Sequence, residues 1–168
     1  MTAAVDRRVL ILQELEALLS NLDIELTTGR IPAGNFVRNR NALPKELVPG
    51  VILIDGDEAP DPRFRQMQQG RQGGIPAQIM KMTPEIYVVL DVRKPANKNV
   101  GEDLSIARIA IMKAILGDKT LSTIVGANGD ITYSGCVTDL ARNRQMEGQM
   151  GMIFSYSYPW LPGEIIEL

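Results

Sequence analysis

The stretch Gly148-Gln-Met-Gly-Met-Ile-Phe-Ser-Tyr-Ser-Tyr-Pro159 decides the fold class. Large apolar side chains at every second position alternate with small or hydroxylated ones. Because successive side chains of a β-strand point to opposite faces of a sheet, this period of two predicts a strand with two different faces. One face carries Met150, Met152, Phe154, Tyr156 and Tyr158, and the other carries Gly151, Ile153, Ser155 and Ser157.

Three further segments are predicted to be strands. Residues 46–55 contain a run of aliphatic side chains, residues 79–93 alternate in character, and residues 130–140 follow a turn signal. Pro84 lies within the second of these segments. Because proline donates no hydrogen bond to a neighbouring strand, it predicts a bend or a sheet edge at this position.

Two segments have the three- and four-residue spacing of amphipathic helices. The second, residues 102–116, follows Asn99, a predicted N-cap with Glu102 in capping-box spacing. A short helical piece follows at residues 119–125. The helix at residues 102–116 has a wide apolar surface, which predicts that it packs against a second partner as well as against the sheet of its own chain. The first helix, residues 4–21, places on one stripe Val5, Val9, Leu12, Leu15, Leu19 and Leu22.

The order helix, strand, strand, helix, strand, strand predicts an α+β fold. We expect a mainly antiparallel sheet with two principal helices packed on one face. The chain of 168 residues fits a single domain over residues 1–168. Within it we expect short extended pieces at residues 24–42, a long loop at about residues 56–78 and a C-terminal tail at residues 160–168.

The composition argues against several classes of function. The chain has no histidine, one cysteine and a formal net charge of −2. Without histidine there is no Ser-His-Asp or Cys-His activation of a nucleophile and no histidine metal site. The charge predicts no general attraction to nucleic acid, and the sequence shows neither a signal peptide nor a membrane-spanning run. We therefore expect a protein that is not an enzyme, needs no cofactor and has no membrane partner.

Four carboxylates are crowded together after the first predicted strand. Carboxylates gathered on a loop can bind a hard divalent cation. The segment lacks the fifth-position ligand and the glycine of an EF-hand loop, so an exposed acidic turn without metal is the preferred interpretation. The candidates for a metal site are Asp55, Asp57, Glu58 and Asp61.

Basic side chains lie in or beside the predicted loop. The glycine-rich stretch at residues 70–74 lacks the Gly-Lys-Ser/Thr ending of a phosphate-binding loop. An exposed, solvated surface is the simpler interpretation of the arginines, and contact with a DNA backbone or a partner protein is the alternative. The candidates for such contacts are Arg63, Arg65 and Arg71.

Cys136 and Lys113 are the remaining candidates for a chemical role. Cys136 has no lysine or arginine beside it in the sequence, so we predict a small core residue and not a reactive thiolate. Lys113 lies in the apolar helix, where a side chain that extends to solvent is preferred to a buried base.

The order of these features resembles that of the tail terminator (tail completion) proteins of long-tailed bacteriophages, the lambda-like minor tail family. An amphipathic helix precedes a proline-containing start of an apolar strand with an acidic glycine turn, Leu47-Val-Pro-Gly-Val-Ile-Leu-Ile-Asp-Gly-Asp-Glu58. A longer strand follows, Glu85-Ile-Tyr-Val-Val-Leu-Asp-Val-Arg-Lys-Pro95, and then a helix with its trailing piece at residues 102–125. The closing strand is Gly151-Met-Ile-Phe-Ser-Tyr-Ser-Tyr158, so the resemblance extends from Val5 to Tyr158.

The resemblance implies a virion protein, assembled in the host cytoplasm, whose subunits form a hexameric ring at the head-proximal end of the tail tube. The ring would end tube polymerisation and offer an attachment surface to the neck. The implied partners are further copies of the chain, the tail tube protein, a head-completion or neck protein, and the genomic DNA that passes through the channel. We further hypothesise that the loop at about residues 56–78 binds the tube.

A head-to-tail ring contact is heterologous, so its two patches on each subunit differ. We expect one patch on a sheet edge. The other is expected on the exposed side of the second helix, near Arg108, Met112 and Lys113.

Three other functions remain open. The chain fits another head–tail connector or neck component, such as a head-closure protein. It also fits a small metal-dependent enzyme that uses Asp55, Asp57 and Glu58, or a non-viral binding module that does not self-assemble.

Overall fold

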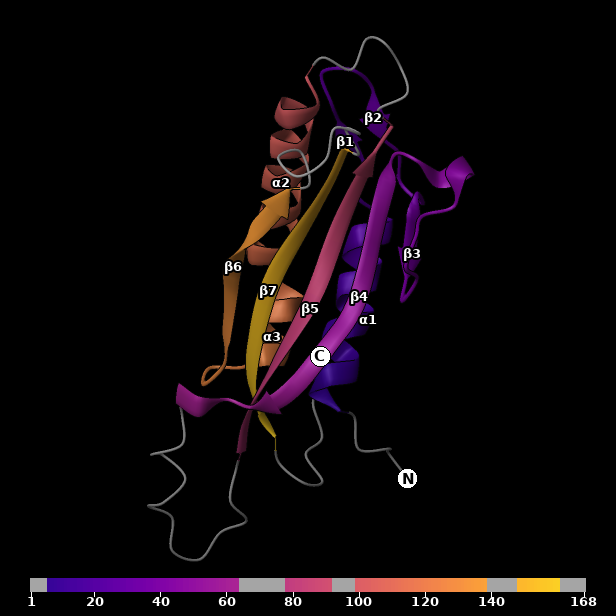
Figure 1. Ribbon diagram of the computed structural model, residues 1–168. Coiled ribbons are helices and arrows are strands. Elements are labelled where there is room, and N and C mark those ends of the chain that lie inside the picture. Colours follow the sequence, from indigo (N-terminus) through magenta and orange to yellow (C-terminus); the bar gives the residue numbers. More distant parts are fainter. Residues whose placement is uncertain (1–5, 64–77, 92–98, 139–147, 161–168) are drawn as a thin grey trace, which may run out of the picture.

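In the part of the chain that the structure describes, a five-stranded sheet carries three α-helices on one face (Figure 1). The structure is a computed structural model, and it describes residues 6–63, 78–91, 99–138 and 148–160. The helices are α1 (Arg7–Ser20), α2 (Val100–Leu116), α3 (Lys119–Val125) and the short 3-10 helix η1 (Lys45–Leu47). The strands are β1 (Ile24–Glu25), β2 (Arg30–Ile31), β3 (Phe36–Arg38), β4 (Gly50–Pro60), β5 (Gln78–Leu90), β6 (Asp130–Thr138) and β7 (Gly148–Trp160).

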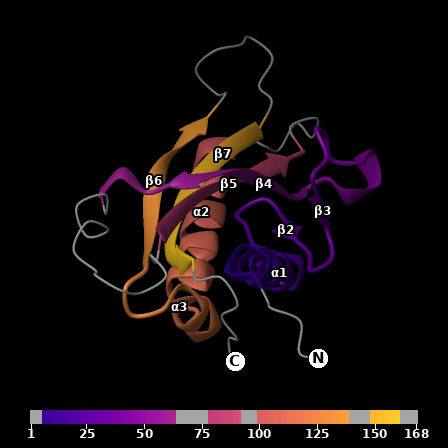
Figure 2. The same ribbon diagram turned by 90° about the horizontal axis from the view of Figure 1, so that it is seen from below.

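The strands of the sheet are arranged in the order β3-β4-β5-β7-β6. β3 runs parallel to β4, and the other neighbouring pairs are antiparallel. β1 and β2 form a separate antiparallel hairpin. The three helices lie together below the sheet in Figure 2, which leaves its opposite face open. This arrangement confirms the predicted α+β class, with α3 as a third, shorter helix beside the two principal ones.

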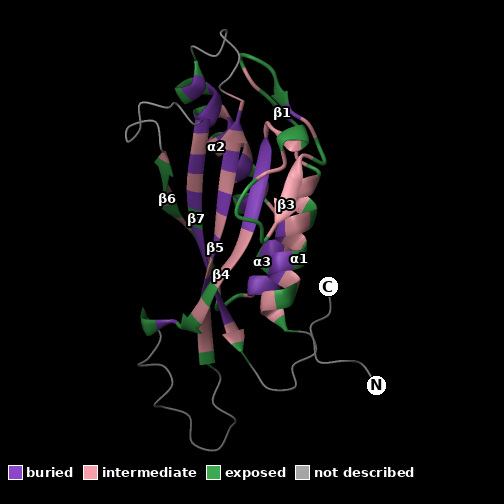
Figure 3. Cartoon of the chain, turned by 45° about the vertical axis from the view of Figure 1, so that its right-hand side comes forward, coloured by how far each residue is buried: buried purple, intermediate pink, exposed green. Residues whose placement is uncertain are grey.

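The buried face of β7 is the one that its alternation predicts. Its five large side chains, from Met150 to Tyr158, are at most 2% exposed and belong to the core that the helices cover. The same alternation of buried and half-buried positions runs along β5 and is visible in Figure 3. On the open face Ile153 is 38% exposed, but Ser155 and Ser157 are buried. The burial of Ser157 is explained below.

α1 begins at the Asp6 cap and packs one stripe against the sheet. The Asp6 carboxylate accepts a hydrogen bond from the Arg8 backbone N–H at 2.9 Å. Val9, which was predicted to lie on the buried stripe, is 46% exposed. At 3.6 residues per turn it lies about 100° around the helix from the centre of that stripe. The buried residues of α1 are Ile11, Leu12, Leu15 and Leu19.

The N-terminus of α2 is held by a carboxylate and not by the predicted cap. Asn99 occupies the N-cap position, but its side chain makes no capping hydrogen bond. The buried Asp103 accepts hydrogen bonds from the Thr27 N–H at 2.7 Å, from the Thr27 hydroxyl at 2.6 Å and from the Thr28 hydroxyl. Burial alone would raise the pKa of Asp103, but the hydrogen bonds from Thr27 and Thr28 bring it below its ordinary value. Asp103 therefore anchors the β1–β2 turn to α2.

The loop predicted at residues 56–78 is shorter than expected. β4 continues to Pro60 and β5 begins at Gln78, so both ends of the predicted loop are strand. Between them, residues 64–77 lie outside the described residues.

A β-bulge at Gly56 lets β4 continue beyond its acidic turn. The register between β4 and β5 shifts here, and Gly56 has a φ of +71°. A Cβ at this position would lie 2.0 Å from the Thr83 carbonyl oxygen, so only glycine fits. The neighbouring Pro84 is buried in the central strand β5, where the bulge accommodates its missing N–H. Of the two predicted alternatives at Pro84, a bend or a sheet edge, the sheet edge was therefore wrong, because β5 is the central strand and its register with β4 shifts beside Pro84.

Candidate functional site

Asp55, the first of the predicted metal candidates, is held by an arginine on the helix side of the sheet. Its two carboxylate oxygens accept hydrogen bonds from Arg38 Nε at 2.7 Å and from Arg38 Nη2 at 3.0 Å. The same guanidinium contacts Glu16 of α1 at 2.8 Å. The hydrogen bonds from Arg38 lower the pKa of Asp55, so this carboxylate is charged and paired at neutral pH.

The other carboxylates of the acidic turn do not join Asp55. Glu58 Oε2 lies 3.4 Å from Arg8 Nε, and Asp57 is exposed. Asp61 lies on the open side of the sheet, where it pairs with a third arginine. Across the described residues, no group of three His, Cys, Asp or Glu side chains is placed to hold a metal ion. The structure thus does not bring the four candidates together, because strand alternation and the bulge point them at different partners.

Asp61 forms a clasp on the open face with Arg63, Asp130 and Ser157. The Asp61 side chain is fully buried and lies 2.8 Å from Arg63 Nη2, and it accepts a hydrogen bond from the Ser157 hydroxyl at 2.6 Å. Arg63 Nη1 also lies 3.3 Å from Asp130 on β6. The hydrogen bonds from Arg63, and then from Ser157, hold the pKa of Asp61 well below its usual range. The clasp covers the end of β7 and explains why Ser157 is buried.

The three arginines predicted to contact DNA or the tube have different places. Arg63 is half exposed, and its guanidinium already belongs to the clasp. Arg65 and Arg71 lie outside the described residues. Arg63, the one of these three arginines that the structure describes, therefore holds the chain against the sheet just before residue 64.

α2 has two apolar stripes, as its composition predicts. One stripe faces the sheet and is buried. On the opposite side Ile109 is 46% and Leu116 is 45% exposed, and the exposed Lys113 lies between them. The i, i+4, i+7 spacing puts these three residues on one line, which we call the outer stripe of α2. The buried stripe consists of Leu104, Ala107, Ile111 and Ile115.

The other two residues predicted for a subunit interface flank the outer stripe. Met112 is half buried and packs against the core. Arg108 is half buried and faces β6, where its charge opposes the rise in the pKa of Tyr133 that burial causes. Cys136 on β6, predicted to be a core residue, is exposed. Because β6 is the edge strand, Cys136 has a neighbouring strand on one side only.

An apolar belt crosses the open face of the sheet. Tyr87 on β5 pairs with Ile52 on β4 and with Gly151 on β7, and Gly151 pairs with Val137 on β6. Directly paired residues project from the same face, so these side chains form one row across the strands. Val137 is 54% exposed. With the neighbouring positions that share this face, the belt comprises Val37, Ile52, Ile54, Tyr87, Val137, Gly151 and Ile153. Val137 and Ile153 are exposed, Ile52 is only 3% exposed, and the other members are half-buried.

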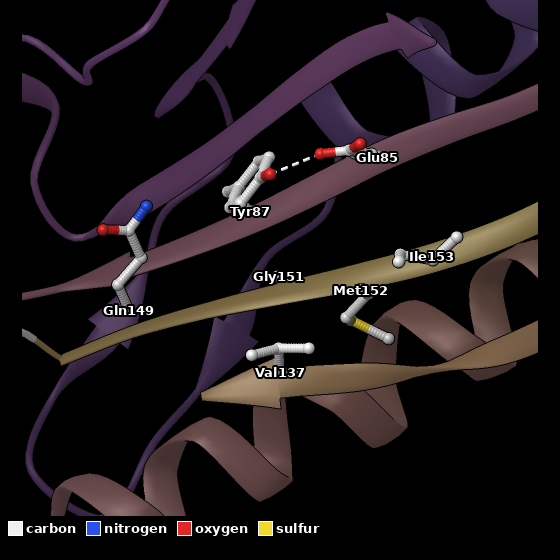
Figure 4. A pocket seen from close by; sticks show the side chains of 7 residues that line it. All are labelled: Glu85, Tyr87, Val137, Gln149, Gly151, Met152 and Ile153. Carbon is white, nitrogen blue, oxygen red and sulfur yellow. Dashed lines mark hydrogen bonds between the residues drawn. The ribbon is translucent and has the colours of Figure 1, made fainter. Parts of the chain in front are cut away.

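The belt contains a hollow of about 360 Å³ between β5, β7 and β6 (Figure 4). Its floor is Gly151, where a Cβ would lie only 3.0 Å from the Tyr87 ring. The Tyr87 hydroxyl donates a hydrogen bond to the Glu85 carboxylate at the rim. The hollow is lined by Glu85, Tyr87, Val137, Gln149, Gly151, Met152 and Ile153.

Sequence reasoning did not identify the belt. The run Val51-Ile-Leu-Ile54 is apolar at every position and was interpreted as a buried strand. In an antiparallel sheet with helices on one face only, the other face is normally polar. The structure confirms the buried strand, because Val51, Ile52 and Leu53 are at most 3% exposed and Ile54 is half-buried. The exposed members of the belt, Val137 and Ile153, lie instead on β6 and β7.

None of the helices in the described residues combines the length and the apolar character that crossing a lipid bilayer requires. No model of a known protein family matches the chain, and no curated protein is significantly similar to it.

Proposed function

We propose that the chain is a structural subunit of a phage tail whose ring caps the head-proximal end of the tail tube. The observation that carries this proposal is the presence of two different exposed apolar surfaces. The apolar belt lies on the open face of the sheet, and the outer stripe of α2 lies on the far side of the helix layer. Exposed apolar surfaces of this kind mark protein–protein contacts.

Two unlike surfaces on one subunit suit a head-to-tail assembly. A two-fold dimer uses the same patch on both partners, whereas a ring joins one patch to a different patch on the next copy. If each contact rotates the next copy by a sixth of a full turn, six contacts close a hexameric ring. The chain offers one surface on each side of its sheet-and-helix sandwich (Figure 2), so each copy has a side for either neighbour.

The order of the long elements supports the phage tail assignment within the class of ring proteins. α1, β4, β5, α2, α3 and β7 follow one another in the order on which the resemblance to tail terminators rests. In the described residues, three of the four carboxylates that are candidates for a metal site, Asp55, Glu58 and Asp61, are each engaged by a different arginine. We therefore favour a role in assembly over catalysis.

The proposed mechanism is the blocking of tube growth by a bound ring. The face of the ring toward the tube would occupy the sites that the next tube subunits need, and its other face would receive the neck. Residues 66–74 belong to the segment that we assign to the tube. The clasp fixes the chain at Arg63, immediately before that segment.

Negative-stain electron microscopy of the purified protein, alone and mixed with tail tubes of the same virus, tests the proposal. We expect rings with a central hole, and tubes that carry a ring at one end and no longer elongate. The matched variant replaces residues 66–74 by a flexible linker of equal length, and it should form rings that no longer cap tubes. Binding to portal-bearing heads before tails join would favour another neck component, and absence of both rings and tube binding would overturn the proposal.

A further inference from the structure

We propose that the outer stripe of α2 of one copy docks into the hollow of the apolar belt of the next copy. The contact is head-to-tail, and it rests on the proposed ring-forming function. It assigns a specific partner to each of the two exposed apolar surfaces.

The two surfaces are complementary in apolar character. Ile109 and Leu116 project from α2 on either side of Lys113, and both are nearly half exposed. Val137 and Ile153 are exposed at the hollow, and Gly151 leaves its floor without a side chain. Burying these four aliphatic side chains against one another removes apolar area from water, which is the main favourable contribution to association.

The two surfaces are also complementary in charge. Lys113 is the middle residue of the outer stripe and makes no ion pair within the described part of the chain. Glu85 is the acidic residue that lines the hollow, and the hydrogen bond found for it there comes from the Tyr87 hydroxyl. A carboxylate accepts several hydrogen bonds, so Glu85 has room for the Lys113 ammonium group. Contact between the two charges would set the register of the helix in the hollow.

The dimensions of the two surfaces agree. The outer stripe extends from Ile109 to Leu116, which is about 10 Å of α-helix. The hollow spans the two strand-to-strand spacings from β5 to β6, which also amounts to about 10 Å. A helix laid across the strands thus reaches from Glu85 on β5 to Val137 on β6.

Charge reversal tests the contact with the full chain, under conditions in which the wild type forms rings. Lys113→Glu brings a second carboxylate up to Glu85, and Glu85→Lys brings a second ammonium group up to Lys113. Either variant alone should raise the concentration needed for half-maximal assembly by about tenfold or more, because like charges in an interface are strongly unfavourable. Sedimentation velocity over a concentration series measures this shift.

An equimolar mixture of the two variants is the decisive sample. Where the variants alternate around a ring, the new glutamate of one copy meets the new lysine of the next. At the following contact the native Lys113 meets the native Glu85, so every contact joins opposite charges. The mixture should therefore assemble as well as the wild type although neither variant does so alone. Failure of the mixture to assemble, with both variants folded, would overturn the proposal.

Controls separate the contact from general effects of charge and folding. Lys119→Glu on α3 and Glu46→Lys in η1 make the same charge changes at positions away from both surfaces, and they should assemble like the wild type. Glu85→Gln retains an acceptor for the Tyr87 hydroxyl and tests the carboxylate charge alone. Unaltered assembly of Lys113→Glu would disprove this contact but leave the ring function standing. A wild type that forms no ring, alone or on tubes, would instead remove the proposed function itself.

Discussion

The two faces of β7 differ in what covers them, although both belong to the same strand. On the inner face Phe154 and Tyr156 are fully buried by the chain's own helices. On the outer face Ile153 is exposed in the apolar belt, while Ser157 is buried beneath the clasp. The inner face therefore stabilises the fold, and the outer face divides into a polar part that the chain closes itself and an apolar part that it leaves open.

This difference predicts that stability and assembly can be separated by mutation. Substitutions on the inner face should lower the free energy of unfolding, because they leave a cavity among packed side chains. Substitutions of the exposed belt residues Val137 and Ile153 should change that free energy little and weaken association between copies instead. The clasp should show an intermediate effect on stability, since it joins β7 to the end of β4 by charged hydrogen bonds.

The largest effect on stability is expected for Phe154→Ala. Phe154 is fully buried, and its ring packs against Tyr133 with 5.2 Å between the ring centroids. Truncation should lower the free energy of unfolding by about 3–5 kcal/mol. Urea unfolding followed by circular dichroism measures it. The matched control is the adjacent Ile153→Ala, for which we expect a loss of about 1 kcal/mol or less. Equal losses for both would contradict the distinction between the two faces.

An intermediate effect is expected for Asp61→Asn in the clasp. Removing the charge weakens the bonds to Arg63 and Ser157 and should lower the free energy of unfolding by about 1–3 kcal/mol at neutral pH. The pKa of Asp61 is lowered by folding, so its charged form stabilises the protein fully above about pH 5, and this contribution is lost progressively as the pH falls below that value.

The stability difference between wild type and Asp61→Asn should therefore shrink as the pH is lowered from about 5 to about 2. Chemical unfolding at several pH values checks this. A difference that stays constant over the range would show that the Asp61 charge contributes nothing, and that the effect of the substitution arises elsewhere.

The smallest effect on stability is expected for Gly151→Val in the hollow. The new side chain meets the Tyr87 ring, which lies at the surface and can shift, and a β-branched residue suits a strand. The free energy of unfolding should change by about 1 kcal/mol or less. Because the side chain fills the hollow, association between copies should weaken by about tenfold, as sedimentation velocity would show. Undiminished association would show that the hollow is not part of the contact.

Much of the fold could be predicted from local patterns. The alternation in β7 and the spacing in α2 each reflect a single element, so the residues themselves specify which face is buried. The length of the loop and the place of Pro84 could not be predicted, because both depend on a bulge that forms only when β4 pairs with β5. The exposure of Cys136 depends likewise on β6 being the edge strand.

The candidate site was predicted only in part. The second surface of α2 could be predicted, because the apolar part of this helix is too wide for one partner. Lys113 lies on that second, exposed surface. The belt joins residues of five strands, so its continuity appears only when the register is known. The division of the acidic turn among Arg8, Arg38 and Arg63 likewise depends on which face each carboxylate occupies.

Disulfide cross-linking between copies tests the central claim, that the outer stripe of α2 meets the belt, most directly. Cys136 is the only cysteine of the chain, so Cys136→Ser provides a cysteine-free background. Into this background Lys113→Cys and Ile153→Cys are introduced separately, and the two proteins are oxidised alone and as a mixture under ring-forming conditions. The account predicts a cross-linked dimer in the mixture and little in either protein alone. Equal cross-linking of each variant with itself, or none in the mixture, would contradict it.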